Sequence, residues 1–281
     1  MASDSPETID TGTDELLCEL RDRVATVTLN RPHKRNSLSD RLSPALRAIL
    51  IELELRHDVG CVLLTGTGDA FCSGGDVSGM GSDAPKEEDH EMRPNVEERV
   101  ADLVRRQEAL TLRLYELAKP TVAALPGPAA GAGFSIALAC DLRVASPRAF
   151  LVSAFRNIGL SGDYGASWFL NRLLGQSKAK ELMFLSERIP AEQAAELGLV
   201  NAVFPEETFR EDAFEYARRL ANGPTMALSR MKRNVNRGAD LGLRESLELE
   251  AQNMIASFQS EDAREAIKAF AEKREPQFKF R

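Results

Sequence analysis

The segment Ala123-Ala124-Leu125-Pro126-Gly127-Pro128-Ala129-Ala130-Gly131-Ala132-Gly133-Phe134 decides the fold of this chain. An apolar run over 121–125 ends in Pro and Gly, small residues follow, and a second apolar run spans 134–140. That order predicts a strand, a tight glycine loop and a buried helix. Small side chains let a ligand approach the backbone, and the first N–H groups of the helix have no intrahelical partner. The loop therefore suits a developing negative charge.

A second junction of the same kind lies upstream. The run Cys61-Val62-Leu63-Leu64-Thr65 indicates a buried strand, and the glycine-rich segment Gly66–Asp76 follows it. Two such junctions can each supply one N–H to the same oxygen, which makes an oxyanion hole from backbone alone. Either loop by itself is better explained as a tight turn without a ligand, whereas the pair favours a functional site.

The remaining pattern indicates alternating strands and helices, which is typical of the α/β class. Residues 1–14 are polar and acidic and are predicted to be a disordered lead-in. Later segments predict a hairpin over 16–29, a helix capped by Ser39 and reaching about Arg56, and helical spacing over 96–117. Beyond Pro205 the chain is almost all helical, and its last helix is expected to run unbroken from about Leu241 to Lys273.

Bulk composition excludes several classes of function. A chain of 281 residues with 43% hydrophobic residues can bury one sizeable core. A net charge of −7 does not favour a nucleic-acid partner, and no apolar run reaches membrane-spanning length. The N-terminus lacks the basic and apolar stretches of a secretory signal, and four scattered cysteines suit free thiols, so we expect a cytoplasmic protein. Three histidines argue against a histidine-rich metal site.

Several short motifs follow one another in a fixed order. They are Leu29-Asn30-Arg31-Pro32 with Asn36-Ser37-Leu38, Phe71–Asp76, Lys119–Ala124, the Gly127–Gly133 loop, Ala139–Arg143, Ile158-Gly159-Leu160 and Ala194–Val200. In this order and spacing the chain resembles the crotonase (enoyl-CoA hydratase/isomerase) superfamily from about Leu16 to Phe280. The resemblance implies an α/β fold built as a spiral of ββα repeats. It further implies an acyl-CoA-binding catalytic core over 15–204 and a C-terminal helical region over 205–281 that assembles trimers, or hexamers as pairs of trimers.

The resemblance also implies the chemistry. Members act on acyl-CoA thioesters, so coenzyme A enters as part of the substrate and no separate cofactor is expected. By motif position the two oxyanion donors are the backbone N–H groups of Gly75 and Ala132. Many members have Gly where Ala132 stands, and a backbone N–H survives that change.

The acid and base residues depart from the best-known hydratases. Those enzymes carry two glutamates, and the corresponding positions here are Ser135 and Phe155. One carboxylate remains, because Asp163 matches a position used by some isomerases, including dienoyl-CoA and ring-epoxide or oxepin-type acyl-CoA isomerases. One base that takes a proton and returns it elsewhere suffices to move a double bond, and an apolar pocket would raise the pKa of that base. The alternative is that Asp163 simply caps a helix.

Substrate contacts are assigned by the same resemblance. Arg31, Lys34 and Arg35 follow the first hairpin, where the family meets the nucleotide of CoA, and Lys273 matches a basic residue that reaches CoA phosphates, often across a subunit interface. The two loops add Ser73, Gly74, Asp76, Val77 and Gly131. Phe155, Tyr164 and Trp168 either line the acyl pocket or belong to the core. Residues 79–95 form either a loop over the substrate or a solvated excursion.

Other functions stay open at this stage. Loss of both glutamates is what a non-catalytic acyl-CoA-binding scaffold would show, and a hydratase with non-standard acid and base residues is a further alternative. The spacings Gly127-x3-Gly131-x-Gly133 and Tyr115-x3-Lys119 imitate short-chain dehydrogenases, but the two motifs occur in the wrong order. The favoured hypothesis is isomerisation of an enoyl-CoA double bond through a thioester enolate.

Overall fold

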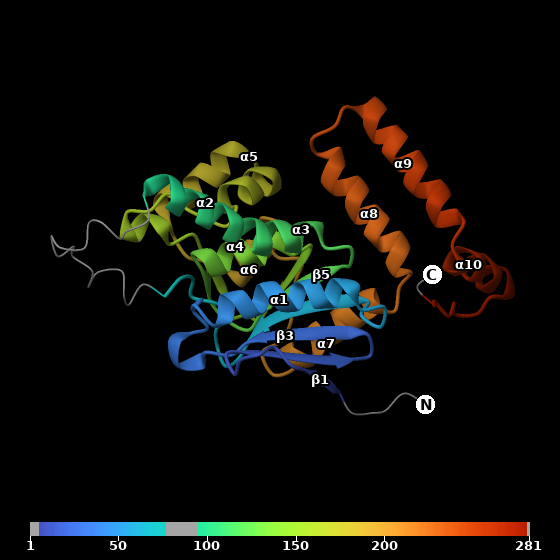
Figure 1. Cartoon of the computed structure of the whole chain (residues 1–281), viewed down its shortest axis with the longest axis horizontal. Helices are drawn as coiled ribbons and strands as arrows, with labels where there is room; N and C mark the ends of the chain where they lie inside the picture. Colours follow the sequence, from blue (N-terminus) through green and yellow to red (C-terminus); the bar gives the residue numbers. More distant parts are fainter. Residues whose placement is uncertain (1–5, 77–94, 280–281) are drawn as a thin grey trace.

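The computed structural model describes residues 6–76 and 95–279. Within these residues the strands form a larger sheet of seven in the order β1-β2-β3-β4-β5-β7-β10 and a smaller sheet of three in the order β6-β8-β9 (Figure 1). The strands of the larger sheet are β1 (Glu7–Ile9), β2 (Leu16–Arg21), β3 (Val24–Leu29), β4 (Cys61–Gly66), β5 (Thr121–Leu125), β7 (Leu142–Ala145) and β10 (Ala202–Val203). Those of the smaller sheet are β6 (Ala129–Ala130), β8 (Phe150–Val152) and β9 (Ile189–Pro190).

Helices connect the strands and extend the chain beyond them. Their bounds are α1 (Leu42–Leu55), α2 (Val96–Gln107), α3 (Arg113–Glu116), α4 (Ala132–Ala139), α5 (Ala166–Leu185), α6 (Ala191–Glu196), α7 (Phe209–Ala221), α8 (Thr225–Gly238), α9 (Leu243–Phe258) and α10 (Glu261–Glu272). Short 3-10 turns are η1 (Pro32–Lys34) and η5 (Phe155–Ile158), and the turn η4 (Glu108–Leu112) between α2 and α3 is π-helical. Gly175 has non-helical backbone angles inside α5.

Both faces of the larger sheet are covered by helices. Successive side chains of a strand point to opposite faces, so neighbours such as Leu63 and Leu64 enter different cores. Leu64 belongs to the main core under α1, η4, α3, α4 and α5, whereas Leu63 packs against α7 on the other face. Strands β3, β4, β5, β7 and β10 run parallel, as expected for strands buried on both sides.

The chain builds the two sheets by a repeated unit. β5 contributes to the larger sheet and β6 to the smaller one before α4 begins, and β7, β8 and α5 repeat that order. Because β5 and β7 pair in parallel and β6 and β8 do the same, each unit stacks on the one before it. The two predicted glycine loops follow the carboxyl ends of the parallel strands β4 and β5.

Two sequence expectations about the ends of the chain are wrong. The lead-in over 1–14 contains a strand, because Glu7–Ile9 pairs antiparallel with β2. The long last helix is two helices, since Ser260 accepts a hydrogen bond from the Ala263 amide and begins α10 as its N-cap. Within the predicted C-terminal helical region over 205–281, α7 packs against the larger sheet as part of its second core.

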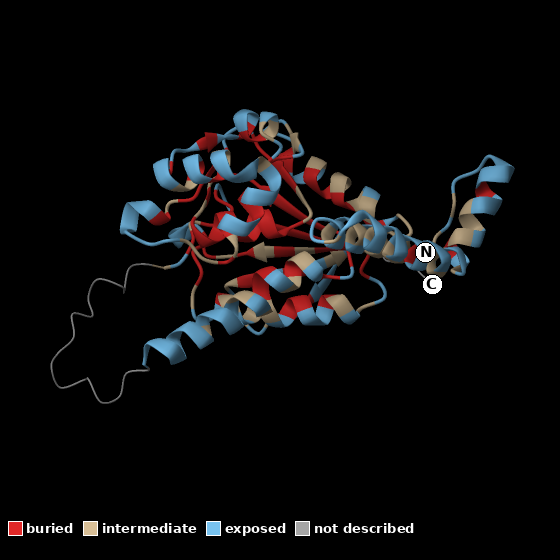
Figure 2. Ribbon diagram, turned by 90° about the horizontal axis from the view of Figure 1, so that it is seen from above, coloured by how far each residue is buried: buried red, intermediate tan, exposed pale blue. Residues whose placement is uncertain are grey.

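Helices α8, α9 and α10 form an arm that extends from one end of the sheets (Figure 1). The arm is mostly exposed or half-buried, in contrast to the buried centre of the molecule (Figure 2). One of its anchors is Lys232 on α8, whose ammonium lies 3.0 Å from the carboxylate of Asp141 and donates to the carbonyl of Leu114. Burial raises the pKa of Asp141, and the ion pair with Lys232 opposes that rise.

Candidate active site

The two predicted glycine loops meet in the fold. The amide of Ala130 donates to the carbonyl of Cys72 at 2.9 Å, and residues 72 and 129 form a parallel bridge. Gly74 has a positive φ of 97° and lies so close to the other loop that a Cβ on it would sit 3.3 Å from the amide nitrogen of Ala132. Glycine is required at this contact because a side chain would separate the loops.

Two amides at this junction have no backbone acceptor among the described residues. The backbone groups on either side of Gly75 are hydrogen-bonded: Leu38 donates to the Gly74 carbonyl, and Asp76 donates to the Leu38 carbonyl. The N–H of Gly75 itself makes no such bond among the described residues. Ala132 is the first residue of α4, where an amide has no intrahelical partner. A Cβ built on Gly75 would meet no described atom within 4 Å, so there is open space beside that amide.

The motif around Asn36 holds the first loop in place. Its side chain is fully buried, accepts from the Arg31 amide at 2.9 Å and donates to the carbonyl of Ala70 at 2.8 Å. The guanidinium of Arg31 is also buried, where it donates to the Ser37 carbonyl at 2.7 Å and lies 3.3 Å from Asp76. Through these contacts, Arg31 and Asp76 help to order the first loop.

Asp163 lies on a loop with an unusual backbone. Gly162, Tyr164 and Gly165 all have positive φ values, of 107°, 50° and 83°. One carboxylate oxygen of Asp163 is buried without a hydrogen-bond partner among the described residues. Burial raises the pKa of Asp163 to about 6, because the charged form loses hydration and gains no compensating donor. Such a carboxylate is a stronger base near neutral pH than an exposed one.

The two positions that carry glutamates in the best-known hydratases shape the surroundings of Asp163. The ring of Phe155 is buried and lies 3.5 Å from where a Cβ on Gly162 would be and 3.9 Å from a Cβ on Gly131. Ser135 is fully buried on α4, and its hydroxyl donates to the backbone carbonyl of Asp163 at 2.9 Å. The Asp163 loop and the Ala132 loop are thus joined through these two side chains.

Ser135 shows what sequence reasoning missed at this site. From the sequence, Ser135 only marks a position where a glutamate is absent, whereas in the structure its hydroxyl links α4 to Asp163. Gln107 was not singled out at all, although its side-chain oxygen accepts from the Tyr164 amide at 2.7 Å. The two partners are 57 residues apart in sequence, and no local pattern connects them.

An apolar cleft of about 380 Å³ lies beside the Asp163 loop, between α2–η4–α3 and the start of α5. Tyr115, Trp168 and Phe169 form its aromatic wall, with ring centroids 5.0 Å apart for the Tyr115–Trp168 and Trp168–Phe169 pairs. Gln107 and Gly165 line the same cleft. Tyr164 is buried in the main core, so it reaches the site through its backbone.

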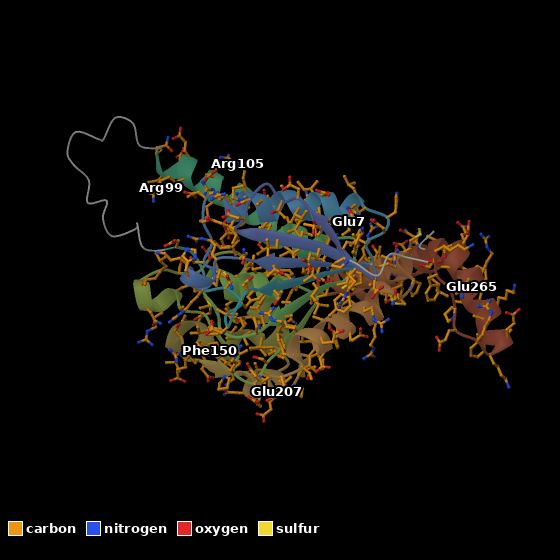
Figure 3. The ribbon with its side chains drawn as sticks, turned by 90° about the horizontal axis from the view of Figure 1, so that it is seen from below. Glu7, Arg99, Arg105, Phe150, Glu207 and Glu265 are labelled. Atoms are coloured by element: carbon orange, nitrogen blue, oxygen red, sulfur yellow. The ribbon has the colours of Figure 1, made fainter. Side chains whose placement is uncertain are left out.

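The predicted CoA contacts are more scattered. Lys34 and Arg35 are exposed in the turn beside the first loop, where the carbonyl of Lys34 accepts from the Ser73 hydroxyl at 3.2 Å. Lys273 lies at the C-terminal end of α10. Figure 3 shows that α10, marked by Glu265, lies far from α2, marked by Arg99 and Arg105. Within one chain, Lys273 is therefore remote from Asp163. Val77 and residues 79–94 of the expected loop lie outside the described residues.

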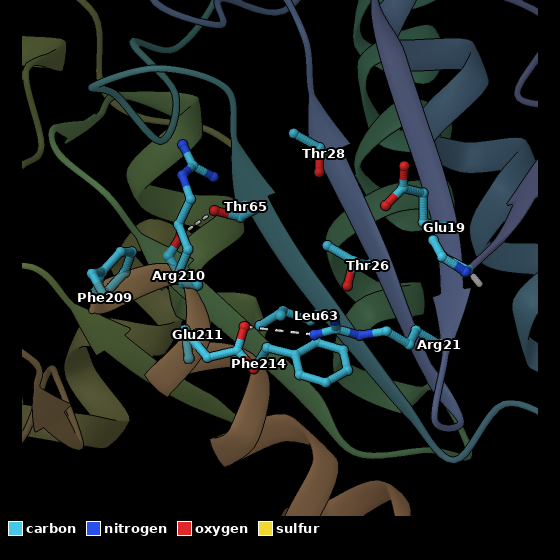
Figure 4. Close-up of a pocket in the computed structure, with 13 residues that line it drawn as sticks. Glu19, Arg21, Thr26, Thr28, Leu63, Thr65, Phe209, Arg210, Glu211 and Phe214 are labelled. Atoms are coloured by element: carbon cyan, nitrogen blue, oxygen red, sulfur yellow. Dashed lines mark hydrogen bonds and ion pairs between the residues drawn. The ribbon is translucent and has the colours of Figure 1, made fainter. Parts of the chain in front are cut away.

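A second cleft, of about 310 Å³, lies on the other face of the larger sheet and holds no candidate residue (Figure 4). Two of its charged side chains contact other parts of the protein: Arg21 lies 3.7 Å from Glu211, and Arg210 donates to the carbonyls of Gly66 and Gly68.

The structure also shows why Tyr115 and Lys119, which have the spacing of a dehydrogenase pair, do not form one. The hydroxyl of Tyr115 donates to the Asn236 carbonyl at 3.4 Å, while Lys119 is buried and donates to the carbonyls of Leu53 and Arg56. Burial lowers the pKa of Lys119 to about 8. The two side chains serve different structural contacts, so they do not act as a pair.

The described residues also bear on redox, metal and membrane functions. All four cysteines are buried free thiols, and burial raises the pKa of each well above its usual value, which makes them poor nucleophiles. Over 6–76 and 95–279, no group of three potential metal ligands is found. No helix in that part of the chain is both long and apolar enough to cross a membrane.

Known proteins agree with this architecture. The family model described as "Enoyl-CoA hydratase/isomerase" matches residues 19–281. The chain belongs to the enoyl-CoA hydratase/isomerase family. The 1,2-epoxyphenylacetyl-CoA isomerase of Escherichia coli K12 is 36% identical over 94% of this chain and 97% of that protein. The 4-chlorobenzoyl coenzyme A dehalogenase-1 of an Arthrobacter species is 35% identical over 85% and 84%.

Solved structures give the same result for the fold. The crystal structure of an enoyl-CoA hydratase from Bacillus anthracis covers 95% of this chain and 100% of its own, with a TM-score of 0.85 and 30% identity. The predicted crotonase fold is therefore confirmed. The relatives bear the names of an isomerase, a dehalogenase and a hydratase, so family membership establishes an acyl-CoA enzyme and leaves the reaction to be argued from the site.

Proposed function

We propose that this enzyme moves a double bond of an enoyl-CoA, with Asp163 as its single acid/base residue. The observation that carries the proposal is the half-buried Asp163 carboxylate, whose raised pKa suits a base, in a site where the usual glutamate positions hold Ser135 and Phe155. Neither a serine bonded to a backbone carbonyl nor a phenylalanine can activate water in their place. The proposal therefore favours proton transfer within the substrate over addition of water.

The proposed reaction needs no group beyond those of the chain and the substrate. Asp163 removes a proton from the carbon next to the thioester carbonyl of a 3-enoyl-CoA, and the electron pair delocalises into an enolate. The N–H groups of Gly75 and Ala132 donate to the enolate oxygen, where the negative charge develops. Protonated Asp163 then returns the proton to the far end of the conjugated system, which yields the 2-enoyl thioester and regenerates the carboxylate.

Solvent deuterium exchange tests this function directly. Purified enzyme is incubated in D2O with a straight-chain 3-enoyl-CoA and, separately, with a ring-bearing acyl-CoA, because the aromatic wall of the cleft and the names of two relatives favour a ring. We expect the absorbance of the conjugated thioester from the 3-enoyl-CoA, and deuterium uptake to the extent that the proton on Asp163 exchanges with D2O before it is returned. A mass gain of one water would instead support hydratase activity. Tight CoA thioester binding with no exchange in either substrate would support the non-catalytic scaffold.

We further propose that the arm of α8, α9 and α10 assembles the chain into a trimer, or a hexamer of two trimers. The arm exposes large apolar side chains that a solvated monomer would leave unpartnered, among them Val235 (74% exposed), Leu243 (76%) and Phe270 (88%). An interface there would also explain how Lys273, remote from Asp163 in its own chain, reaches the CoA of a neighbouring subunit.

Light scattering of the purified protein measures the assembly. We expect three or six chain masses for the wild type and a smaller species for Phe270→Glu, because a buried unpaired charge opposes association. Leu55→Glu is the control, since Leu55 is equally apolar and 74% exposed but lies on α1. A monomeric wild type at micromolar concentration, or equal dissociation by both variants, would contradict this role of the arm.

A further inference from the structure

The peptide unit that joins Asp163 to Tyr164 is held from both sides. Its carbonyl oxygen accepts from the Ser135 hydroxyl at 2.9 Å, and its N–H donates to the side-chain oxygen of Gln107 at 2.7 Å. Both hydrogen bonds therefore fix the orientation of one rigid plane, which sets ψ of Asp163 and φ of Tyr164. The direction in which the Asp163 side chain leaves the backbone follows from those angles.

This peptide needs such support because its neighbourhood is strained. Tyr164 has a φ of 50°, in the left-handed region that bulky residues seldom occupy, and glycines with positive φ precede and follow the pair. Backbone in sparsely populated conformations persists only where surrounding contacts hold it. Without the Gln107 acceptor, the Tyr164 amide would lose the bond that holds this conformation.

The position of Gln107 is set by the helix that carries it. Gln107 is the last residue of α2, and the π-helical turn η4 follows immediately, with the Thr111 hydroxyl bonded to the Gln107 carbonyl at 3.1 Å. π-Helical turns occur frequently at functional sites. Gln107 also lines the apolar cleft, so it contacts both the Asp163 loop and the space beside it.

The amide of Gln107 has a further advantage over a carboxylate. Its oxygen accepts a hydrogen bond without placing a second negative charge beside Asp163, where like charges would raise the pKa of that residue further. The charged side chains that act on the phenol of the adjacent Tyr164 are Asp163 itself, Arg47 of α1, and Arg106 and Asp102 of α2, whereas burial is the cause of the raised pKa of Asp163. A carboxylate at position 107 would add another negative charge to this group of side chains.

We propose that Gln107 is a positioning residue, which together with Ser135 orients the Asp163–Tyr164 peptide and thereby the Asp163 carboxylate. This inference rests on the proposed role of Asp163 as the base. It adds a residue to the site from a helix, α2, that none of the family motifs quoted above includes.

Three variants test the proposal in the deuterium-exchange assay. Gln107→Leu preserves the approximate size and removes the acceptor, so kcat is expected to fall roughly tenfold with KM nearly unchanged, as misplacement of a reacting group does. Gln107→Glu preserves the acceptor and adds charge, so kcat at high pH is expected to stay near that of the wild type while the acidic limb of the pH profile moves up by roughly one unit. Arg99→Ala, on the exposed surface of α2, is the control.

A measurement without substrate reports on the two hydrogen bonds that hold the Asp163–Tyr164 peptide. Hydrogen exchange of the peptide over 160–166 is expected to be faster in Gln107→Leu, with an unchanged thermal midpoint. Ser135→Ala removes the other bond of the same peptide unit, and its effect on kcat combined with Gln107→Leu is expected to be less than additive.

The outcomes separate this proposal from the proposed function. If Asp163→Asn keeps full activity, the function fails whatever Gln107 does. If Asp163→Asn is inactive but both Gln107 variants match the wild type in kcat, pH profile and exchange, the positioning role is wrong and the function stands. A rise in KM with a lowered thermal midpoint in both Gln107 variants would likewise overturn the role, because that is the signature of a structural residue.

Discussion

Asp163→Asn is expected to reduce the kcat for double-bond isomerisation by roughly 10²- to 10⁴-fold, the range attributed to a positioned acid/base group. Asparagine has nearly the same shape but cannot accept the substrate proton, so binding of the thioester should persist. Rates of deuterium exchange and product formation, measured with dissociation constants for the acyl-CoA, separate the two effects. Glu187→Gln, which alters an exposed carboxylate away from the site, is the control.

The pH dependence follows from the raised pKa of Asp163, about 6. The base acts when deprotonated, so kcat/KM of the wild type should fall as the pH drops through about 6, and this limb should disappear from any residual activity of Asp163→Asn. A fully active Asp163→Asn enzyme with the same acidic limb would show that another group is the base.

The same pKa predicts a gain in stability for the variant. Because the folded-state pKa lies above the unfolded value of roughly 4, the folded protein binds more protons between about pH 4 and 6. The contribution of Asp163 to the free energy of unfolding therefore decreases as the pH rises through that window. Asp163→Asn should be at least as stable as the wild type at pH 7, with the difference vanishing below about pH 4, as urea titrations at the two pH values would show.

Gly74→Ala is expected to lower kcat roughly 100-fold by separating the two oxyanion loops, in line with the loss of one backbone donor. The new Cβ would lie 3.0 Å from the Ala130 carbonyl oxygen and 3.3 Å from the Ala132 amide nitrogen, and φ of Gly74 is 97°. Both loops are backbone at this contact, so neither can rotate away as a flexible side chain would. The Gly75 and Ala132 amides then no longer converge on one oxygen.

The control for Gly74→Ala is Gly198→Ala. Gly198 also has a positive φ, of 77°, but a Cβ there would meet nothing within 4 Å and the residue lies away from both loops. Both variants carry the strain of a left-handed alanine, about 1–2 kcal/mol, and Gly74→Ala adds its clash with the Ala130–Ala132 backbone. Both thermal midpoints should therefore fall, that of Gly74→Ala further, while only Gly74→Ala loses kcat. Equal activity of the two variants would argue against an oxyanion role for this junction.

Local pattern was sufficient for much of the fold. The run of small residues over 123–134 predicts β5, the loop and α4, and the structure has them at Thr121–Leu125 and Ala132–Ala139. The hairpin of β2 and β3 and the buried strand β4 are confirmed in the same way. These elements were predictable because apolar runs, alternating patterns and glycine loops are properties of adjacent residues.

The errors arise where distant residues decide. Glu7–Ile9 is polar enough to suggest disorder, yet the edge of β2 offers it a strand to pair with. Arg31 has the sequence position of a CoA contact, and only the structure shows that its guanidinium is buried against Ser37 and Asp76. The break at Ser260 is the exception, because its capping signal was present in the sequence and was outweighed by the apolar stripe on either side.

The sequence by itself determined the family, the two glycine loops and the survival of one carboxylate, Asp163, where two glutamates are absent. Only the tertiary structure decided that Ser135 and Gln107 hold the peptide beside that carboxylate. The physical reason is distance along the chain: these hydrogen bonds join residues 28 and 57 positions apart, so they exist only after α2, α4 and the Asp163 loop have packed together.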